Sequence, residues 1–472
     1  MIADLKPYTE YNDSGLPWLG QVPGHWETRP AFGAFLPNHD RNRGMREKTV
    51  LSLSYGRIII KPPEKLHGLV PESFETYQIV NPGDIILRTV DLQNDHTSLR
   101  VGMVRNRGII TSAYLALRVN AGVNADFGFQ FLNVWDSSKA IYGYGSGLRQ
   151  NLDFAHFKRM PVAIPPPAEQ AAIVRFLDWA NGRLELAIRA KRKVIALLNE
   201  QKQAIIHRTV TGGLDPSVPL KPSGIPWLAD IPQHWEEQRL GHAIRLQTGF
   251  PFASTGFVQD ERGTRLLRGI NVTSSGLRWH AVVRWRRKPS DGLDEFALQV
   301  GDIVLGMDRP IVRSGVRAAT VQDNDTPSLL LQRVARLRPT YRLDARFLLL
   351  LLRGRLFADY IAPIFTGISV PHLSPEQIKG FKVPLPPLME QRTIVRYLEA
   401  GTSGLDTAIS RLEREIDLLR EYRTRLVADV VTGKLDVREA AARLPEEAAA
   451  DIAEDDTDLS DETELADEQA TV

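Results

Sequence analysis

Residues 14–27 read SGLPWLGQVPGHWE, and residues 223–236 read SGIPWLADIPQHWE. Nine of the fourteen aligned positions are identical. Similarity of this kind indicates that a structural unit has been duplicated within the chain. Both copies carry two tryptophans, and the four are Trp18, Trp26, Trp227 and Trp235. Because they lie in the repeated part, we expect them to pack in the core rather than to stack on nucleic-acid bases.

A second duplicated block begins at residues 165–170, PPPAEQ, and returns at residues 386–391, PPLMEQ. It continues without a gap to Leu214-Asp215 and Leu435-Asp436. The inserts at 28–160 and 237–381, which separate the two kinds of block, show far weaker similarity to each other. A scaffold has therefore been duplicated while its inserts differ, as expected if the inserts face different targets.

The second block predicts a long helix in each copy. Prolines close the preceding strand, and Gly212-Gly213 and Gly433 supply the C-terminal stop. Apolar residues recur at seven-residue intervals, which is typical of a coiled coil. We expect the helix-pairing seam to contain Leu177, Leu184, Leu198, Ile205, Leu398, Leu405, Leu412, Leu419 and Leu426. Roughly 40 residues would make a rod of about 60 Å.

The nearest partner for each leucine stripe is the duplicate helix of the same chain, and an antiparallel pair is the simplest arrangement. Lys191 breaks the seven-residue pattern. Its aliphatic stem can cover apolar surface while its ammonium reaches water. Alternatively it meets Glu413 or Glu415 and fixes the register of the pair.

The inserts predict an α+β fold, with mixed α/β globular domains and an internal pseudo-two-fold repeat. Strands are expected at Val50–Leu53, Arg57–Ile60, Asp84–Leu87, Ile109–Leu117, Asp302–Leu305 and Leu329–Leu337, and helices near Phe127–Val134 and Phe347–Tyr360. The expected segments are globular at 1–160 and 216–381, helical at 161–215 and 382–436, and acidic and disordered at 437–472.

Charge is distributed unevenly along the chain. Residues 1–436 carry 57 Lys plus Arg against 44 Asp plus Glu, whereas residues 437–472 carry 13 acidic and two basic residues. The basic body makes a polyanionic partner plausible, and the acidic tail either shields that surface or only solubilises the chain. No cysteine, no apolar run of membrane-spanning length and no signal-like start are present, which favours a cytoplasmic protein.

Sequence patterns for catalysis are weak. Residues 142–147, YGYGSG, do not open a helix after a strand and are expected to form a loop rather than a cofactor site. The repeated His25 and His234 favour packing or capping, and the Asp91, Asp95 and His96 group favours a solvated loop over a metal site. We therefore expect no catalytic residue, no metal and no cofactor bound by this chain.

The duplicated proline-rich entries with Glu169-Gln170 and Glu390-Gln391, and the helices ending in Thr211-Gly212 and Thr432-Gly433, resemble Type I restriction–modification specificity subunits. The element that opens each half is also similar to that family. The resemblance covers residues 14–436 and implies a noncatalytic DNA-recognition subunit. Each insert would be a target recognition domain that reads half of a split, asymmetric site, and the coiled coil would space the two domains.

The resemblance also implies partners for the chain. They are double-stranded DNA, two methyltransferase subunits and, through these, motor-nuclease restriction subunits. S-adenosylmethionine, ATP and Mg are expected on the partners. A turn of B-DNA is about 34 Å, so a rod of the expected length could act as a ruler. The rival interpretations are a self-contained DNA modification enzyme and a structural coiled-coil adaptor with other ligands.

Side chains that hydrogen-bond to base edges and phosphates are the candidates for DNA contact. In the first insert they are Lys61, Arg88, Asn94, Arg100, Arg149 and Gln150. In the second they are Arg268, Asn271, Arg309, Arg313, Arg317, Ser369 and His372.

Overall fold

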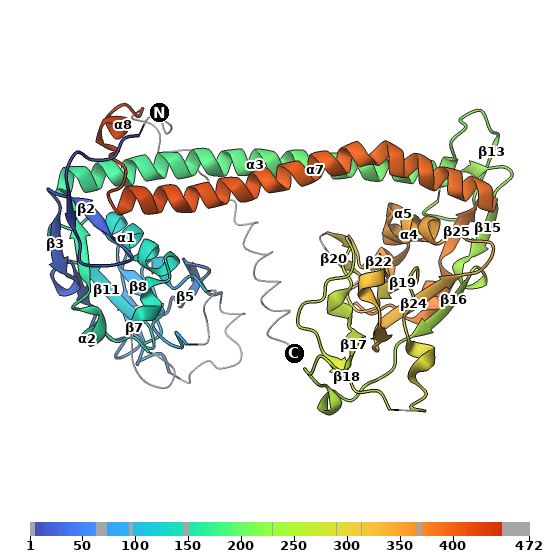
Figure 1. Cartoon of the computed structure of the whole chain (residues 1–472), viewed down its shortest axis with the longest axis horizontal. Coiled ribbons are helices and arrows are strands. Elements are labelled where there is room, and N and C mark those ends of the chain that lie inside the picture. Colours follow the sequence, from blue (N-terminus) through green and yellow to red (C-terminus); the bar gives the residue numbers. More distant parts are fainter. Residues whose placement is uncertain are drawn as a thin grey trace. The chain divides into compact units, whose positions relative to one another are not determined.

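The structure is a computed structural model that describes residues 5–62, 73–93, 98–144, 151–228, 230–288, 290–312, 314–365 and 371–445. The chain forms two compact units. Unit 1 contains the chain up to Lys191 and from Arg414 onward, and unit 2 contains Arg192–Glu413. Each unit therefore holds one insert and part of both long helices, α3 (Pro167–Gly212) and α7 (Leu388–Val431) (Figure 1).

A four-stranded antiparallel sheet organises unit 1, in the order β4-β11-β8-β9. Its strands are β4 (Phe35–Pro37), β8 (Ile85–Leu87), β9 (Val101–Met103) and β11 (Leu115–Val119). Helix α1 (Ala125–Ser137) contacts β9 and β11. It begins at the N-cap Asn124, whose side chain accepts a hydrogen bond from the Phe127 amide.

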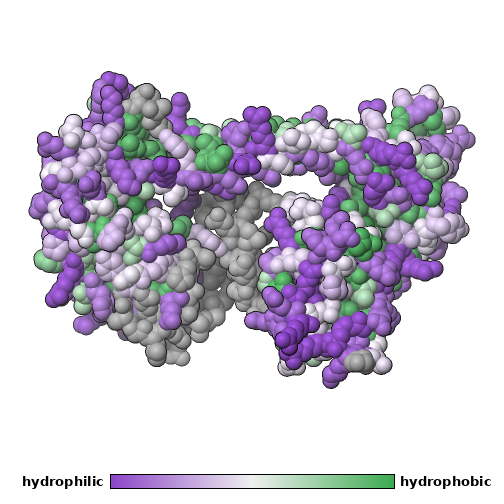
Figure 2. Space-filling view, viewed as in Figure 1, coloured by the Kyte–Doolittle hydropathy of each residue, from purple (hydrophilic) through white to green (hydrophobic). Residues whose placement is uncertain are grey.

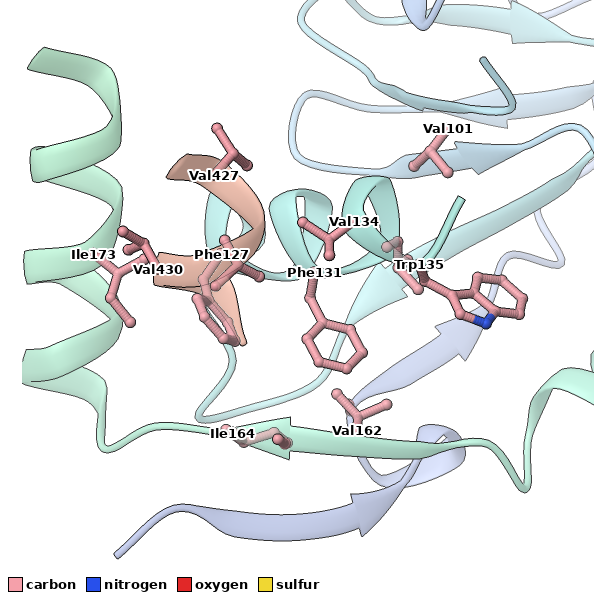
Figure 3. Packing of buried hydrophobic residues seen from close by; sticks show 14 of the residues in the cluster. Val101, Phe127, Phe131, Val134, Trp135, Val162, Ile164, Ile173, Val427 and Val430 are labelled. Carbon is pink, nitrogen blue, oxygen red and sulfur yellow. The ribbon is translucent and has the colours of Figure 1, made fainter. Parts of the chain in front are cut away.

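The core of unit 1 joins the insert to the helices. Phe127, Phe131 and Trp135 on α1 are fully buried, in one cluster with Ile173 of α3 and Val430 of α7 (Figure 3). Other elements of the unit are β1 (Tyr11–Asp13), β2 (Gln21–Pro23), β3 (Glu27–Pro30), β5 (Leu51–Ser54), β6 (Arg57–Ile60), β7 (Gln78–Val80), β10 (Gly108–Ile110), α2 (Phe154–Phe157) and β12 (Pro161–Ile164).

Unit 2 repeats this sheet in the order β16-β24-β19-β22. Its strands are β16 (Ile244–Thr248), β19 (Ile303–Gly306), β22 (Ala318–Thr320) and β24 (Val334–Pro339). Side chains repeat as well, because Asp84 pairs with Arg118 in unit 1 (Oδ1–Nε 3.4 Å) and Asp302 pairs with Arg338 in unit 2 (2.5 Å). The duplication thus extends into the inserts, although their sequences have diverged.

Unit 2 adds a three-stranded sheet, β18-β17-β23. The strands of this sheet are β17 (Thr264–Leu267), β18 (Arg284–Trp285) and β23 (Ser328–Leu330). Other elements of unit 2 are β13 (Leu220–Lys221), β14 (Ile231–Pro232), β15 (Glu236–Arg239), β20 (Ile311–Val312), β21 (Gly315–Val316), α4 (Ala345–Arg353), α5 (Arg355–Ile361), α6 (Pro375–Gly380) and β25 (Lys382–Leu385).

Three expected elements are interrupted in the structure. The strand expected at Ile109–Leu117 is two strands, β10 and β11, because the chain turns and passes from one sheet to another. The strand expected at Leu329–Leu337 divides in the same way into β23 and β24. The helix expected at Phe347–Tyr360 divides at Gly354, whose backbone is extended (φ −80°, ψ 168°). The strand expected at Arg57–Ile60 is confirmed as β6.

The helices α3 and α7 pack against each other and run antiparallel, as expected. In unit 1, Glu185 pairs with Arg423 at 3.2 Å and Lys191 pairs with Glu415 at 2.5 Å. Lys191 thus meets Glu415, one of the two glutamates named for it, and its role in fixing the register stays a prediction. In unit 2, Lys202 pairs with Asp406.

Burial along the seam is uneven. Leu177, Leu184, Leu398 and Leu426 are buried, whereas the other expected seam residues, Leu198, Ile205, Leu405, Leu412 and Leu419, are half-buried. A second line of buried residues, missed from the sequence, contains Ile188, Ile206, Ile409 and Ile416. Apolar side chains also remain exposed on the helices, including Leu186, Leu418 and Tyr422 in unit 1. Figure 2 shows patches of hydrophobic surface, in green, on the paired helices.

The repeated motifs form one polar cluster in each unit. The buried Glu169 accepts hydrogen bonds from Trp26 Nε1 (2.8 Å) and Tyr8 Oη (2.6 Å), and lies 2.7 Å from His25 Nε2. In unit 2, Glu390 accepts a hydrogen bond from Trp235 Nε1 (3.1 Å) and lies 2.9 Å from His234 Nε2. The tryptophans therefore pack within the scaffold, as expected.

The glutamine that follows each glutamate anchors the helix after the sheet. Gln170 accepts a hydrogen bond from the amide of Asn124, the N-cap of α1, at 2.7 Å. Gln391 accepts one from Asp344, the N-cap of α4, at 2.8 Å. The Glu-Gln pair thus links the start of each long helix to its own insert.

The first residues of the expected acidic tail are folded. Helix α8 (Arg438–Ala442) follows α7, and Val437, Ala440 and Leu444 are buried with the core of unit 1. Arg175 donates a hydrogen bond to the Leu444 carbonyl at 2.7 Å. The expectation of disorder from residue 437 is therefore wrong for 437–445, because small apolar residues line one face of this short segment. Residues 446–472 lie outside the described residues.

Candidate nucleic-acid interface

Arg100 supports its own loop instead of facing a ligand. The residue is fully buried, and its guanidinium donates hydrogen bonds to the carbonyls of Arg88 (3.1 Å), Val90 (2.9 Å) and Asp91 (3.2 Å). The guanidinium also lies over the Tyr142 ring, 5.5 Å from its centroid. The prediction of DNA contact is wrong for Arg100, since its guanidinium is buried and its hydrogen bonds hold the segment after β8.

Arg317 plays the same part in unit 2. It precedes β22 as Arg100 precedes β9, and it donates to the carbonyls of Val272 (3.0 Å), Asp308 (3.3 Å) and Gly269. Arg317 is half-buried and has this structural role, and its contact with DNA remains a prediction. In both units an arginine just before the edge strand donates to carbonyls of neighbouring loops, which follow β8 in unit 1 and follow β17 and β19 in unit 2.

Asn271 is a third structural residue among the candidates. It is buried, its amide donates to the carbonyls of Arg278 (2.9 Å) and His280 (3.2 Å), and its oxygen accepts the Arg268 amide at 3.0 Å. These bonds leave it no access to a base edge. Arg268 is half-buried and donates to the Ala281 carbonyl at 3.2 Å. Burial lowers the pKa of Arg268.

An exposed ionic group in unit 2 contains one further candidate. His372 Nδ1 lies 2.6 Å from Asp308 Oδ1, and Arg333 donates to Asp308 Oδ2 at 2.7 Å. Burial raises the pKa of Asp308, but the hydrogen bonds from Arg333 and His372 outweigh it and lower the pKa overall. Arg309 is exposed next to this group and has a left-handed backbone (φ 42°). The structure thus brings Arg309 and His372 to one surface.

The remaining candidates are not brought together. Lys61 is exposed after β6, and Arg88 is half-buried after β8, with Nη1 3.5 Å from Ser98 Oγ. Both remain predictions. The other candidates lie outside the described residues, and they are Asn94, Arg149, Gln150, Arg313 and Ser369.

A basic pocket in unit 1 was missed from the sequence. It has a volume of about 420 Å³ and is lined by His39, Asp40, Arg41, Arg43 and Arg46, which follow β4. The signal was present as three arginines within residues 41–46, RNRGMR, around a glycine typical of a turn.

Among the residues that the structure describes, no three His, Asp or Glu side chains are grouped as metal ligands. Asp95 and His96 of the expected loop lie outside those residues. The described helices include none with the length and apolar character needed to cross a membrane.

The chain is similar to known proteins over most of its length. Residues 243–417 match the family described as Type I restriction modification DNA specificity domain. The Type I restriction enzyme MjaVIII specificity subunit of Methanocaldococcus jannaschii is 26% identical over 366 residues, which are 76% of this chain and 81% of that protein. The EcoAI specificity subunit of Escherichia coli is 32% identical over 171 residues, which are 36% of this chain and 28% of that protein.

A solved structure concerned with complex assembly and conformational transition of the type I R-M system has the same fold. Its TM-score is 0.52 at 16% identity, and the match covers 88% of this chain and 99% of that one. The similarity of sequence extends over most of the chain, and the duplicated motifs form matching clusters in both units. The chain is thus similar to Type I restriction–modification specificity subunits over most of its length.

Proposed function

We propose that this chain is the noncatalytic DNA-recognition subunit of a Type I restriction–modification complex. Each unit reads one half of an interrupted, asymmetric DNA site. The observation that carries the proposal is the repetition of one sheet, β4-β11-β8-β9 and β16-β24-β19-β22, with different side chains in the loops around it. Two related folds with unlike loops suit the reading of two unlike base sequences.

Recognition would depend on the loops that Arg100 and Arg317 hold in place. Sequence-specific proteins need base-reading groups at fixed positions, because a bidentate contact tolerates little displacement. The two arginines donate hydrogen bonds to the loop carbonyls and leave the outer side chains available. Arg309, His372, Lys61 and Arg88 remain candidates for contact with DNA on these surfaces.

The partners are proposed on the same basis. The exposed Leu186, Leu418 and Tyr422 leave apolar area on the paired helices of unit 1, which supports docking of a methyltransferase subunit there. Two methyltransferase subunits and, through them, motor-nuclease subunits would complete a cytoplasmic complex. S-adenosylmethionine, ATP and Mg would bind to those partners and not to this chain.

The test is a domain exchange read out as DNA methylation. Methylated sites are mapped across the genome of a host that expresses the complex, first with this chain and then with residues 28–160 replaced by those of a related subunit. We expect only one half of the methylated sequence to change. A change in both halves, or methyl transfer by the isolated chain with S-adenosylmethionine, would reject the proposal.

A further inference from the structure

Hydrogen bonds to other segments of unit 1 hold the turn that carries the basic pocket after β4. Asn42, which lies within this turn, is fully buried. The Asn42 amide donates to the carbonyls of Glu47 (2.9 Å) and Phe74 (3.3 Å), and its oxygen accepts the Glu47 amide at 2.9 Å. Gly44, in the left-handed region (φ +72°), donates its amide to Glu75 Oε1 at 2.8 Å. The turn that carries the arginines is therefore held from both sides.

Two of the arginines are fixed within the turn. Arg41 Nη1 donates to the Thr76 carbonyl at 3.1 Å. Arg46 Nη2 donates to Asp40 Oδ1 at 2.6 Å and to the Arg41 carbonyl at 2.7 Å. A guanidinium carries five N–H donors, so these contacts leave others to face the pocket.

Arg43 differs from its neighbours because it is exposed and has no hydrogen-bond or ionic partner within the described part of the chain. The pocket thus gathers three guanidinium groups and His39 around a single carboxylate, that of Asp40. Such an excess of positive charge favours an anion over a neutral ligand. A guanine edge is neutral and would not offset the mutual repulsion of the arginines, whereas a phosphate would.

We propose that this pocket binds a phosphate group, and that its source is the backbone of the DNA read by unit 1. The inference rests on the proposed function and adds a positioning contact to it. Guanidinium groups match phosphate oxygens in bidentate geometry, and contacts of this kind fix the register of a protein on the duplex.

The proposed phosphate contact would be made by unit 1 only. The segment that follows β16 in unit 2, residues 249–256, reads GFPFASTG and contains no arginine. Phe250 and Phe252 pack against each other there, with ring centroids 4.9 Å apart. A substitution in the pocket therefore changes the anchoring of unit 1 without a matching change in unit 2.

The experiment measures DNA binding by the full chain in complex with its methyltransferase subunits. The variants are Arg43→Ala and Arg43→Lys, with Arg159→Ala as a control that removes one exposed arginine of unit 1 outside the pocket. Each is titrated with a duplex that contains the recognition site and with an unrelated duplex, at several salt concentrations. Arg43 has no partner to lose, so these variants should fold.

We expect Arg43→Ala to weaken binding to both duplexes by the same factor. The slope of log affinity against log salt should fall by about 0.9, so that between 50 and 200 mM salt the wild type loses about 3.5-fold more affinity than the variant. Arg43→Lys should keep most of the slope, because lysine still supplies a charge to a phosphate. The control should differ from Arg43→Ala in slope.

Other outcomes would overturn the inference. An unchanged slope in Arg43→Ala means that no phosphate is bound, and an effect on the recognition duplex alone means that Arg43 reads a base. If millimolar inorganic phosphate raises the thermal midpoint of the wild type but not of Arg43→Ala, relative to chloride at equal ionic strength, the ligand is free phosphate. If the wild type shows no preference for the recognition duplex, the proposed function fails, whatever Arg43 does.

Discussion

Replacing Glu169 by alanine should destabilise unit 1 far more than replacing Glu390 destabilises unit 2. The Glu169 side chain is 4% exposed and accepts hydrogen bonds from the buried Tyr8 and Trp26, with His25 at 2.7 Å. The Glu390 side chain is 29% exposed and holds Trp235 at 3.1 Å. The duplication therefore supplies a matched control within the same molecule.

The expected magnitudes follow from the number and burial of these bonds. A hydrogen bond to a charged group contributes roughly 1.5–3 kcal/mol, and a donor left unpaired in the core costs about 1–3 kcal/mol. Two buried donors lose their acceptor in Glu169→Ala, so we expect a loss of about 3–5 kcal/mol in the free energy of unfolding of unit 1. In Glu390→Ala, water can take the place of the partly exposed carboxylate as hydrogen-bond acceptor. The free energy of unfolding of unit 2 should therefore fall by only about 1–2 kcal/mol.

Hydrogen exchange is the appropriate assay, because the two units can open separately and a single melting curve would mix them. Peptides from β11 and α1 report on unit 1, and peptides from β24 and α4 report on unit 2. Glu169→Gln keeps an oxygen acceptor and should lose less than Glu169→Ala. Equal losses of protection in the two alanine variants, or a larger loss from Glu390→Ala, would refute the reasoning.

Three further changes test other contacts. Glu415→Lys should lower the free energy of unfolding by up to about 1 kcal/mol. Adding Lys191→Glu should recover that stability, as measured by thermal unfolding, because the partly exposed pair would be re-formed with its charges exchanged. Arg100→Ala should speed hydrogen exchange in β8 and β9, because three carbonyls lose a donor; unchanged exchange would exclude the structural role. Burial lowers the pKa of His207, so the unfolded state takes up the extra proton, and stability should fall as the pH drops below about 6.5. His207→Gln should reduce that loss in unfolding measured at pH 7.5 and 5.5.

The helix pair could be predicted from the sequence because its signals are local. Prolines, the paired glycines and the seven-residue repeat each lie within a short stretch of sequence. The contact of Lys191 with Glu415 was one of the alternatives that the sequence left open. The depth of burial could not be predicted so well. The leucine repeat marks one line of the seam, whereas the deeper line of Ile409 and Ile416 also contains Thr402 and so lacks a uniform apolar pattern.

The folded start of the tail illustrates a different limit. Composition averaged over residues 437–472 is strongly acidic, and that average concealed the short apolar face of α8. The segment also depends on partners that are distant in the chain. The Asp436 amide donates to the Lys6 carbonyl at 2.8 Å, and Arg438 lies over the Tyr8 ring. Contacts between the two ends of a chain have no local signature in the sequence.

The arginines show why residue type alone misjudges a DNA-binding surface. A guanidinium satisfies backbone carbonyls as readily as it satisfies phosphate oxygens or guanine, so its chemistry does not decide the direction in which it points. Arg100 and Arg317 each precede the edge strand of their sheet and donate hydrogen bonds to backbone carbonyls of neighbouring loops. Arg43 points outward because Asn42 and Gly44 already satisfy the turn around it. The arginines that we propose for contact with DNA are therefore those whose loops are held by other residues, and this criterion requires the structure.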